Sequence, residues 1–413
     1  MEILVFAPYV PYPPWFGGAS RVYHLIRVLG REHRITLLCL GTTAELDAAR
    51  PLRDACVEVL AVPPPPGARW RRLYQARSVL GHPYYRYAYY SAPMRRALDA
   101  LLRRRSFDVI HVEFAHMGYY RLPPGPLRVL DEHNVEYRLL ERVGRQERDP
   151  LRRFYAFVQA RKFRRDELAA CRRMDGVLTT SEADRAVLAA EGVDVPIHVV
   201  PNGVDCEFFT AARPPESGAR LLFTGAINYV PNTDAVLYFC DEILPRVRAV
   251  RPDVSFAIVG RDPPERVRRL AGPSITVTGT VPDVRPWMRD AAVVVVPLRS
   301  GSGTRLKILE ALASGCAVVS SSIGCEGLEV THGRDILIAD RPDEFAAGVL
   351  RCLADPGLRA RLGRGGRALV EQRYRWESIG RALSRHYAEM QDASRRVARV
   401  PAAAWGPGAG LVP

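Results

Sequence analysis

Short apolar runs recur along the chain, and most are separated by longer stretches with the spacing of amphipathic helices. They form two series. The first predicts buried strands at 2–7, 35–40, 57–62, 107–112, 128–131, 177–180 and 197–200, and the second at 221–224, 255–259, 275–278, 293–296, 317–320 and 336–338. Alternation of this kind predicts α/β domains built on doubly wound parallel sheets, whose ligands bind at the carboxyl ends of the strands.

The chain has 413 residues, too many for one hydrophobic core and enough for two domains. After the segment VPNGVD, which ends at Asp205, the composition loosens into TAARPPESGAR, a predicted linker. We therefore expect a first domain at 1–205 and a second at 206–375, facing one another across a cleft. Residues 396–413 are rich in Ala, Pro and Gly and are predicted to be disordered.

Residues 297–328 form the most informative stretch. An apolar strand at 292–297 leads into small residues at 300–303, then a helical run with Glu310, and then a strand at 317–320. In such a βαβ unit, the turn presents backbone N–H groups and the positive end of a helix to an anion. Phosphate is the anion that we expect there.

The helix of this unit carries charges suited to a nucleotide. Lys307 and Glu310 are three residues apart and share one face, while Thr304 and Arg305 lie nearer the turn. A cation suits a diphosphate, and a carboxylate suits the hydroxyls of a ribose. Lys307 and Lys162 are the only lysines among 59 basic residues. The alternative interpretation is an exposed Lys–Glu pair on a solvated helix.

Two further places are candidates for the same cleft. Gly17 and Gly18 follow the first strand and precede a helix expected near Ser20, although a plain loop-to-helix turn would look the same. His133 lies in the segment DEHN at the end of another strand, where it is either a ligand contact or a hydrogen-bonded structural residue.

Composition and charge narrow the class of protein. The chain is 47% hydrophobic and 25% charged, as in soluble globular proteins, and its net charge of +14 favours anionic partners. Arginines and tyrosines at 63–105 and basic residues at 137–173 suit an anionic membrane, single-stranded nucleic acid or merely solvated helix faces.

The cysteines and the lengths of the apolar runs argue against disulfide-rich, zinc-binding and membrane-spanning proteins. The eight cysteines include no C-x-x-C pair, which argues against a disulfide framework or a zinc site and favours a reducing cytoplasm. No apolar run approaches the roughly 20 residues that span a bilayer. The start, MEILVFAPYV, is expected to be a strand and not a signal peptide.

Seven motifs in order resemble the GT-B glycosyltransferases, specifically the retaining nucleotide-sugar transferases of family 4 (group 1). They are PWFGGASR, DEHNVE, VLTTSEAD, VPNGVD, LLFTGAINYVPNTDAV, VTGTVPDVRPWMRDAAVVVVP and the stretch that ends in GCEGL. The resemblance covers the chain to about residue 389, and within the family it is similar to bacterial exopolysaccharide or cell-envelope sugar transferases. It implies two Rossmann-like domains, the first for the acceptor and the second for the nucleotide-sugar donor, and a helix at 376–395 that crosses back to the first domain.

The resemblance also implies roles for individual residues. Glu310 would bind the ribose, Gly18 would lie against the donor phosphate, and His133 would reach the donor sugar and phosphate. Thr280–Asp283 would hold the base through the backbone. The donor-binding set becomes Gly17, Gly18, Gly225, Val281, Ser302, Gly303, Thr304 and Glu310, and the catalytic set becomes His133, Arg305 and Lys307.

The sequence departs from the family at two positions. Ser302 stands where a second glutamate usually precedes Glu310 by eight residues, and GAINYVPN stands where an Arg and a Lys usually grip the diphosphate. Arg305 and Lys307 are the expected substitutes for those cations.

The resemblance predicts retaining transfer of a sugar from a nucleotide diphosphate-sugar to a hydroxyl acceptor, in bacterial polysaccharide or glycoconjugate synthesis. No cofactor or metal is expected, since neither site loop has an Asp-x-Asp motif. The acceptor would be lipid-linked, a saccharide or another hydroxyl compound, with no nucleic-acid partner. We expect a cytoplasmic location, either free or on the inner face of the plasma membrane. The alternatives are a nucleotide-sugar epimerase and a non-enzymatic basic module that binds membranes or nucleic acid.

Overall fold

A computed structural model describes all residues except 66–69, 148, 211–217, 302–303 and 400–413. Within the described residues, the first sheet has seven parallel strands in the order β3-β2-β1-β4-β5-β6-β7. Their bounds are β1 Glu2–Ala7, β2 Arg34–Leu40, β3 Glu58–Val62, β4 Val109–Glu113, β5 Leu127–Glu132, β6 Gly176–Thr179 and β7 Ile197–Val199.

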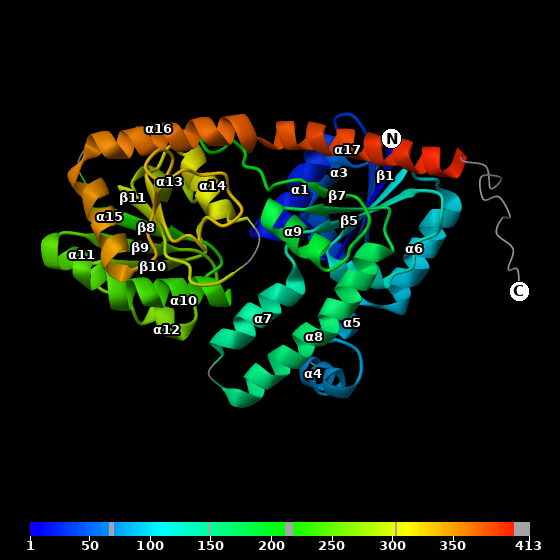
Figure 1. Ribbon diagram of the computed structural model, residues 1–413, viewed down its shortest axis with the longest axis horizontal. Coiled ribbons are helices and arrows are strands. Elements are labelled where there is room, and N and C mark those ends of the chain that lie inside the picture. Colours follow the sequence, from blue (N-terminus) through cyan, green and yellow to red (C-terminus); the bar gives the residue numbers. More distant parts are fainter. Residues whose placement is uncertain (66–69, 148, 211–217, 302–303, 400–413) are drawn as a thin grey trace, which may run out of the picture.

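The second sheet has six parallel strands among the described residues, in the order β10-β9-β8-β11-β12-β13. Their bounds are β8 Arg220–Thr224, β9 Ser255–Val259, β10 Ile275–Gly279, β11 Val293–Val296, β12 Val318–Ser320 and β13 Leu337–Ile338. The two sheets form separate lobes that lie side by side, with helices on both faces of each sheet (Figure 1). The prediction of two doubly wound α/β domains is confirmed.

Strand order locates the ligand edge of each lobe. In the first sheet β1 pairs with β2 on one side and β4 on the other, and in the second sheet β8 pairs with β9 and β11. The direction of winding reverses between β1 and β4 and between β8 and β11, and doubly wound sheets bind ligands outside the carboxyl ends of the strands at such points. The candidate residues should therefore lie after β1, β4, β8 and β11.

Helices cover both sheets. Those of the first lobe are α1 Gly17–Leu29, α2 Thr43–Ala48, α3 Arg50–Ala55, α4 Arg71–Leu80, α5 Tyr84–Tyr89, α6 Ala92–Arg104, η1 Ala115–Tyr119, α7 Glu136–Gln146, α8 Pro150–Arg172 and α9 Glu182–Ala190. Those of the second lobe are α10 Val230–Tyr238, η2 Phe239–Ile243, α11 Leu244–Val250, α12 Glu265–Arg268, α13 Arg285–Arg289, α14 Leu306–Ala313, α15 Pro342–Ala354 and α16 Pro356–Arg373.

The last helix, α17 (Trp376–Arg399), returns to the first lobe and packs along α1 (Figure 1). Its apolar face joins the core beneath β1, and the Trp376 ring stacks on the His24 ring with centroids 5.2 Å apart. Where the chain crosses, the backbone N–H of Val204 donates to the Tyr374 carbonyl oxygen at 2.7 Å. Two adjacent segments therefore join the lobes.

The predicted tail overlaps the end of this helix. Residues 396–399 belong to α17, because the first helix breaker in the tail sequence is Pro401. Residues 400–413 lie outside the described part of the chain. Among the helices that the structure describes, none is long and apolar enough to cross a membrane.

Candidate functional site

A cavity of about 710 Å³ lies between the lobes at the carboxyl ends of the strands. The first lobe contributes the loop after β1 and the start of α1, and the second contributes the loops after β8, β9 and β10. Of the predicted site residues, Gly225, Val281 and Glu310 line it, and so does the segment Thr280–Asp283. The volume and the contributions from both lobes suit a ligand of nucleotide size.

Two glycines form the floor of this cavity in the second lobe. Gly225 follows β8 with φ +142°, and Gly260 follows β9 with φ +155°. A Cβ atom on Gly260 would lie only 1.7 Å from the Gly225 carbonyl oxygen, so the two loops touch backbone to backbone. Both conformations require glycine. The cavity floor is therefore backbone without side chains at these two positions.

Glu310 is one of four acidic residues that line the cavity, together with Asp205, Asp262 and Asp283. It lies on α14, which follows the turn after β11, and its side chain faces the loops after β9 and β10. Burial raises the pKa of Glu310 to about 7, while Lys307 opposes this rise. A half-buried carboxylate beside a backbone-lined cavity is a strong acceptor for ligand hydroxyl groups.

Lys307 lies behind the cavity floor. Its Nζ donates to Asn232 Oδ1 at 2.8 Å and lies 3.8 Å from the centroid of the Phe223 ring. A Cβ atom on Gly225 would be 2.9 Å from Nζ, so the ammonium group lies against the loop after β8. Burial lowers the pKa of Lys307 to about 7, with Arg305 acting in the same direction and Glu310 opposing. Asn232 belongs to the segment that departs from the family pattern, so this lysine binds the segment that replaces the usual cations.

Thr304 and Arg305 face the first lobe. Thr304 Oγ1 donates to the Thr180 carbonyl oxygen at 3.3 Å, which joins the two lobes directly. Arg305 lies against Gly301, and burial lowers the pKa of its guanidinium. Among the described residues, neither Arg305 nor Lys307 lines the cavity. Ser302 and Gly303 lie outside the described residues.

His133 comes directly after β5 and is buried. Its Nε2 lies 2.7 Å from Glu113 Oε2, and its ring packs on Phe114 with centroids 3.7 Å apart. Its other nitrogen, Nδ1, faces Gly18 at 3.5 Å from the position that a Cβ atom would occupy. The same Cβ atom would lie 2.3 Å from the Tyr9 hydroxyl, so only glycine fits at the start of α1.

Gly17, at the start of α1, lies close to the second lobe. A Cβ atom on Gly17 would lie 3.8 Å from Leu306 Cδ1, the first residue of α14. The N-termini of α1 and α14 are therefore close to each other where the two lobes meet. Two helix N-termini that converge from opposite lobes favour a negatively charged group between them.

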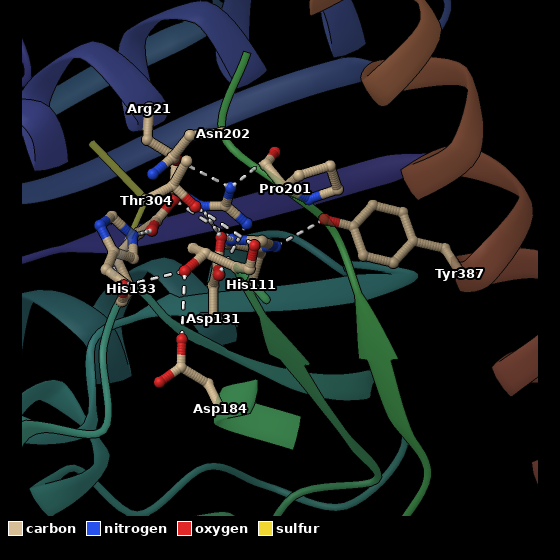
Figure 2. A network of polar contacts seen from close by, with 11 residues as sticks. Arg21, His111, Asp131, His133, Asp184, Pro201, Asn202, Thr304 and Tyr387 are labelled. Carbon is tan, nitrogen blue, oxygen red and sulfur yellow. Dashed lines mark hydrogen bonds and ion pairs between the residues drawn. The ribbon is translucent and has the colours of Figure 1, made fainter. Parts of the chain in front are cut away.

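A buried charge network lies beside His133, and the sequence did not reveal it (Figure 2). Arg21 binds both carboxylate oxygens of Asp131 at 2.9 Å. His111 Nε2 lies 3.2 Å from Glu113 and 3.4 Å from Asp131, and its Nδ1 lies 2.5 Å from the Tyr387 hydroxyl of α17. The network joins α1, β4, β5 and α17, and it fixes the carboxylate that orients His133.

The network should make stability depend on pH. Burial alone would lower the pKa of His111, but Glu113 and Asp131 outweigh it, so the pKa is about 9 in the folded state against 6.5 when unfolded. The stabilisation is complete below pH 6.5 and is lost as the pH rises through about 9. We expect the free energy of unfolding to fall by on the order of 3 kcal/mol over that window. Urea denaturation at several pH values should measure this, with His111→Gln as the control that lacks the dependence.

The buried polar atoms without a hydrogen-bond partner among the described residues include three near the cavity: Arg261 Nε, Thr224 Oγ1 and the Tyr9 hydroxyl. Arg261 follows β9, lines the cavity and lies 5.4 Å from the centroid of the Phe16 ring of the other lobe. Its signal in the sequence was a basic residue directly after a strand, the same signal that revealed His133. Arg261 is thus a cation of the cavity that the motif comparison missed.

Two groups of side chains have donor atoms within 4.8 Å of one another, as a metal site requires: His198, His386 and Glu389, and His111, Glu113 and Asp131. The second group is already bound to Arg21, His133 and Tyr387. The first group lies between β7 and α17. Within the described part of the chain, neither group lines the cavity.

Comparison with known proteins gives two family matches and partial relatives. The Glycosyltransferase Family 4 model matches residues 16–208, and the Glycosyl transferases group 1 model matches residues 218–355. The chain is 30% identical over 213 residues to a phosphatidyl-myo-inositol mannosyltransferase of Mycobacterium tuberculosis, covering 48% of this chain and 55% of that protein. It is 32% identical over 253 residues to a D-inositol 3-phosphate glycosyltransferase of Xylanimonas cellulosilytica, covering 54% and 58%. The match thus spans little more than half the length of these relatives.

Solved structures share the fold over nearly the whole chain. Sucrose-phosphate synthase from Thermosynechococcus elongatus has a TM-score of 0.68 at 18% identity, covering 95% of this chain and all of that chain. Anabaena HepE in complex with UDP-glucose has a TM-score of 0.67 at 14% identity, covering 94% and 99%. With its two family domains in order on two facing parallel-sheet lobes, the chain belongs to the GT-B glycosyltransferases of family 4, also called group 1.

Proposed function

We propose that the chain transfers a sugar from a nucleotide diphosphate-sugar to a hydroxyl acceptor, with retention of the anomeric configuration. The observation that carries the proposal is the cavity between the lobes, where the half-buried carboxylate of Glu310 meets two bare backbone loops and Arg261. The names of the partial relatives, which describe sugar transfer to inositol compounds, and the UDP-glucose in the HepE complex support the same class of reaction.

The residues that line the cavity suggest one orientation for the donor. Glu310 accepts hydrogen bonds from the ribose hydroxyls, and the backbone of Thr280–Asp283 holds the base. The diphosphate then lies over Gly225, where the ammonium of Lys307 is adjacent and Arg261 is within the same cavity. Gly18 and His133 face the sugar and its phosphate from the other lobe, and Arg305 contributes positive charge from the turn at Gly301.

Cleavage of the bond between the anomeric carbon and the phosphate oxygen builds negative charge on the leaving diphosphate. Cations and helix N-termini stabilise that charge. The acceptor hydroxyl attacks from the leaving-group side, and a phosphate oxygen takes its proton. In this mechanism the side chains bind and orient, and neither a metal ion nor a cofactor takes part.

The acceptor and the cellular setting follow from the same proposal. A lipid-linked saccharide or another hydroxyl compound would approach from the first lobe, in the synthesis of a bacterial polysaccharide or glycoconjugate. The enzyme would work in the cytoplasm or at the inner face of the plasma membrane. Nucleic acid has no part in this reaction.

Glu310→Gln tests the ribose assignment. Loss of the charge should weaken donor affinity by about tenfold to a hundredfold, since a hydrogen bond to a charged group contributes about 1.5–3 kcal/mol. Thermal shifts with a panel of UDP-, GDP- and TDP-sugars should identify the donor, and titration should give Kd for both proteins. Glu207→Gln is the matched control, because that side chain is 86% exposed.

Two outcomes would contradict the proposal. Equal donor affinity of Glu310→Gln and the wild type would remove the ribose assignment. A donor that is epimerised in the absence of any acceptor would replace transfer with the epimerase reaction.

A further inference from the structure

Helices α4 and α8 expose large apolar side chains on the first lobe. Leu80 is 95% exposed, Leu151 81%, Phe154 64% and Phe157 61%. Trp70, Leu73 and Val79 are also exposed on or beside α4. Folded proteins rarely leave so much apolar surface in one region without a partner.

The two helices form one fixed unit, which we call the α4–α8 surface. Lys162 of α8 donates to the carbonyl oxygens of Ser78, Val79 and Gly81 at 2.6–3.0 Å, so it caps the last turn of α4. The hydroxyl groups of Ser78 and Tyr155 form a further hydrogen bond of 2.8 Å. One of the two lysines of the chain thus fixes the relative position of these helices.

The apolar side chains of α8 follow one another on a single face, because Leu151, Phe154 and Phe157 are each three residues apart. They lie near the end of α8 that projects from the body of the lobe, close to α4 (Figure 1). A groove of about 740 Å³ between the helices is lined by Val79 and Leu151 and by three arginines, Arg71, Arg72 and Arg152.

The charge of this surface is strongly positive. Helix α4 carries three arginines and no acidic residue, and α8 carries seven basic and two acidic residues. Within the described residues, Arg71, Arg72 and Arg153 form no ion pair. The nearby acidic residue Asp149 is already engaged, because its side chain caps the first turn of α8. The arginines of this surface are therefore available to an anionic partner.

An anionic lipid bilayer fits this combination best. Apolar side chains insert at the boundary between headgroups and acyl chains, and arginines bind the lipid phosphates. Single-stranded nucleic acid stacks on aromatic rings, whereas leucine and valine supply much of the exposed apolar area here. The extended Arg side chains can also bury their aliphatic stems at such a boundary.

We propose that the α4–α8 surface docks the protein onto an anionic membrane. This deepens the proposed function by placing the first lobe, where the acceptor would bind, next to the bilayer. Helix α7, which forms a hairpin with α8, contacts the second lobe: Arg142 of α7 pairs with Glu326 at 2.9 Å and donates to the Gly301 carbonyl oxygen. A docked α7–α8 hairpin would therefore be in contact with the turn that precedes α14.

Vesicle flotation of the full chain tests the docking. Vesicles of phosphatidylcholine alone should bind little protein, and vesicles that contain phosphatidylglycerol should bind much more. Binding to the phosphatidylglycerol vesicles should weaken as the salt concentration rises. The triple variant Leu151→Ser, Phe154→Ser, Phe157→Ser and the double variant Arg71→Gln, Arg72→Gln should each weaken binding by about thirtyfold. The matched controls are Val250→Ser, whose side chain is 64% exposed on α11, and Arg341→Gln, whose side chain is 72% exposed.

Several outcomes would overturn the docking proposal. They are equal binding by the α4–α8 variants and the wild type, indifference to anionic lipid, release of bound protein by RNA, and a dimer that the apolar substitutions dissociate. Thermal shift with the nucleotide-sugar panel, measured on the same variants, separates this proposal from the transferase. Vesicle binding without any sugar-nucleotide response would retain the docking surface and remove the proposed reaction.

Discussion

Replacing Arg21 with methionine is expected to lower the free energy of unfolding by about 3–5 kcal/mol. The guanidinium is fully buried, binds both oxygens of Asp131 and donates to Asn202 Oδ1 at 3.1 Å and to the Pro201 carbonyl oxygen at 3.2 Å. Methionine keeps much of the side-chain volume, so little stability is lost through a cavity. The loss of stability arises because the former partners of the guanidinium stay buried without it. Asp131 would stay charged in a fully buried site, with His111 Nε2 3.4 Å away.

Thermal unfolding followed by circular dichroism should measure this loss, as a fall in Tm of about 6–20 °C. The double variant Arg21→Met, Asp131→Asn is the control, because removing both charges leaves no unpaired ion and should restore part of the stability. Equal Tm values for the wild type and Arg21→Met would mean that the pair is not needed to join α1 to β5. A double variant less stable than Arg21→Met would mean that the carboxylate is stabilised by other groups.

The strands could be predicted because buried parallel strands are continuous apolar runs. Strands β9 and β11 begin and end at the residues expected, and Gly260 and Pro297, residues that interrupt strands, follow the two runs directly. Helix α1 begins at Gly17, three residues before the expected start, because glycine weighs against helix in any sequence-based estimate. The structure gives the reason for the glycine: Tyr9 and Phe114 leave no room for a Cβ atom at Gly18.

The second-lobe half of the site was visible in the sequence, whereas its support in the first lobe was not. Glu310 follows a glycine-rich turn within one βαβ unit, so local spacing was enough to find it. Arg21 and Asp131 are separated by 110 residues, and no local pattern links them. Most arginines of a basic chain are expected on the surface, and nothing in the sequence around Arg21 indicates that this arginine is buried.

The basic stretches also show that sequence alone could not distinguish exposed residues with a role from ordinary surface residues. The sequence indicated that 137–173 is helical and charged, but solvated helix faces remained an equal interpretation. What changes the interpretation is the three-dimensional position of Phe154 and Phe157, which are exposed on α8 where a core position would have been expected for phenylalanine. Lys162 was singled out in the sequence only by its rarity, and its role as a cap of α4 depends on a contact between two helices.

Replacing His133 with alanine is expected to lower kcat by about a hundredfold to a thousandfold, with little change in the Kd of the donor. His133 and Gly18 face each other within the first lobe, whereas the proposed contacts to the base and the ribose all come from the second lobe. The imidazole should therefore act on the charge that develops on the sugar and phosphate, and not on binding of the nucleotide. Steady-state kinetics with the identified donor, together with donor titration, would separate the two quantities.

Glu113 gives this prediction its sharpest control. Its carboxylate holds Nε2 of His133 at 2.7 Å without facing the cavity, so Glu113→Gln should lower kcat by about tenfold through orientation of the ring alone. In the double variant His133→Ala, Glu113→Gln, the second change should then have no further effect on kcat, since no ring remains to be oriented. His82→Ala removes an exposed histidine and should leave kcat unchanged. Wild-type turnover of His133→Ala, or additive losses in the double variant, would mean that the two side chains act separately and that His133 is a structural residue of the cleft.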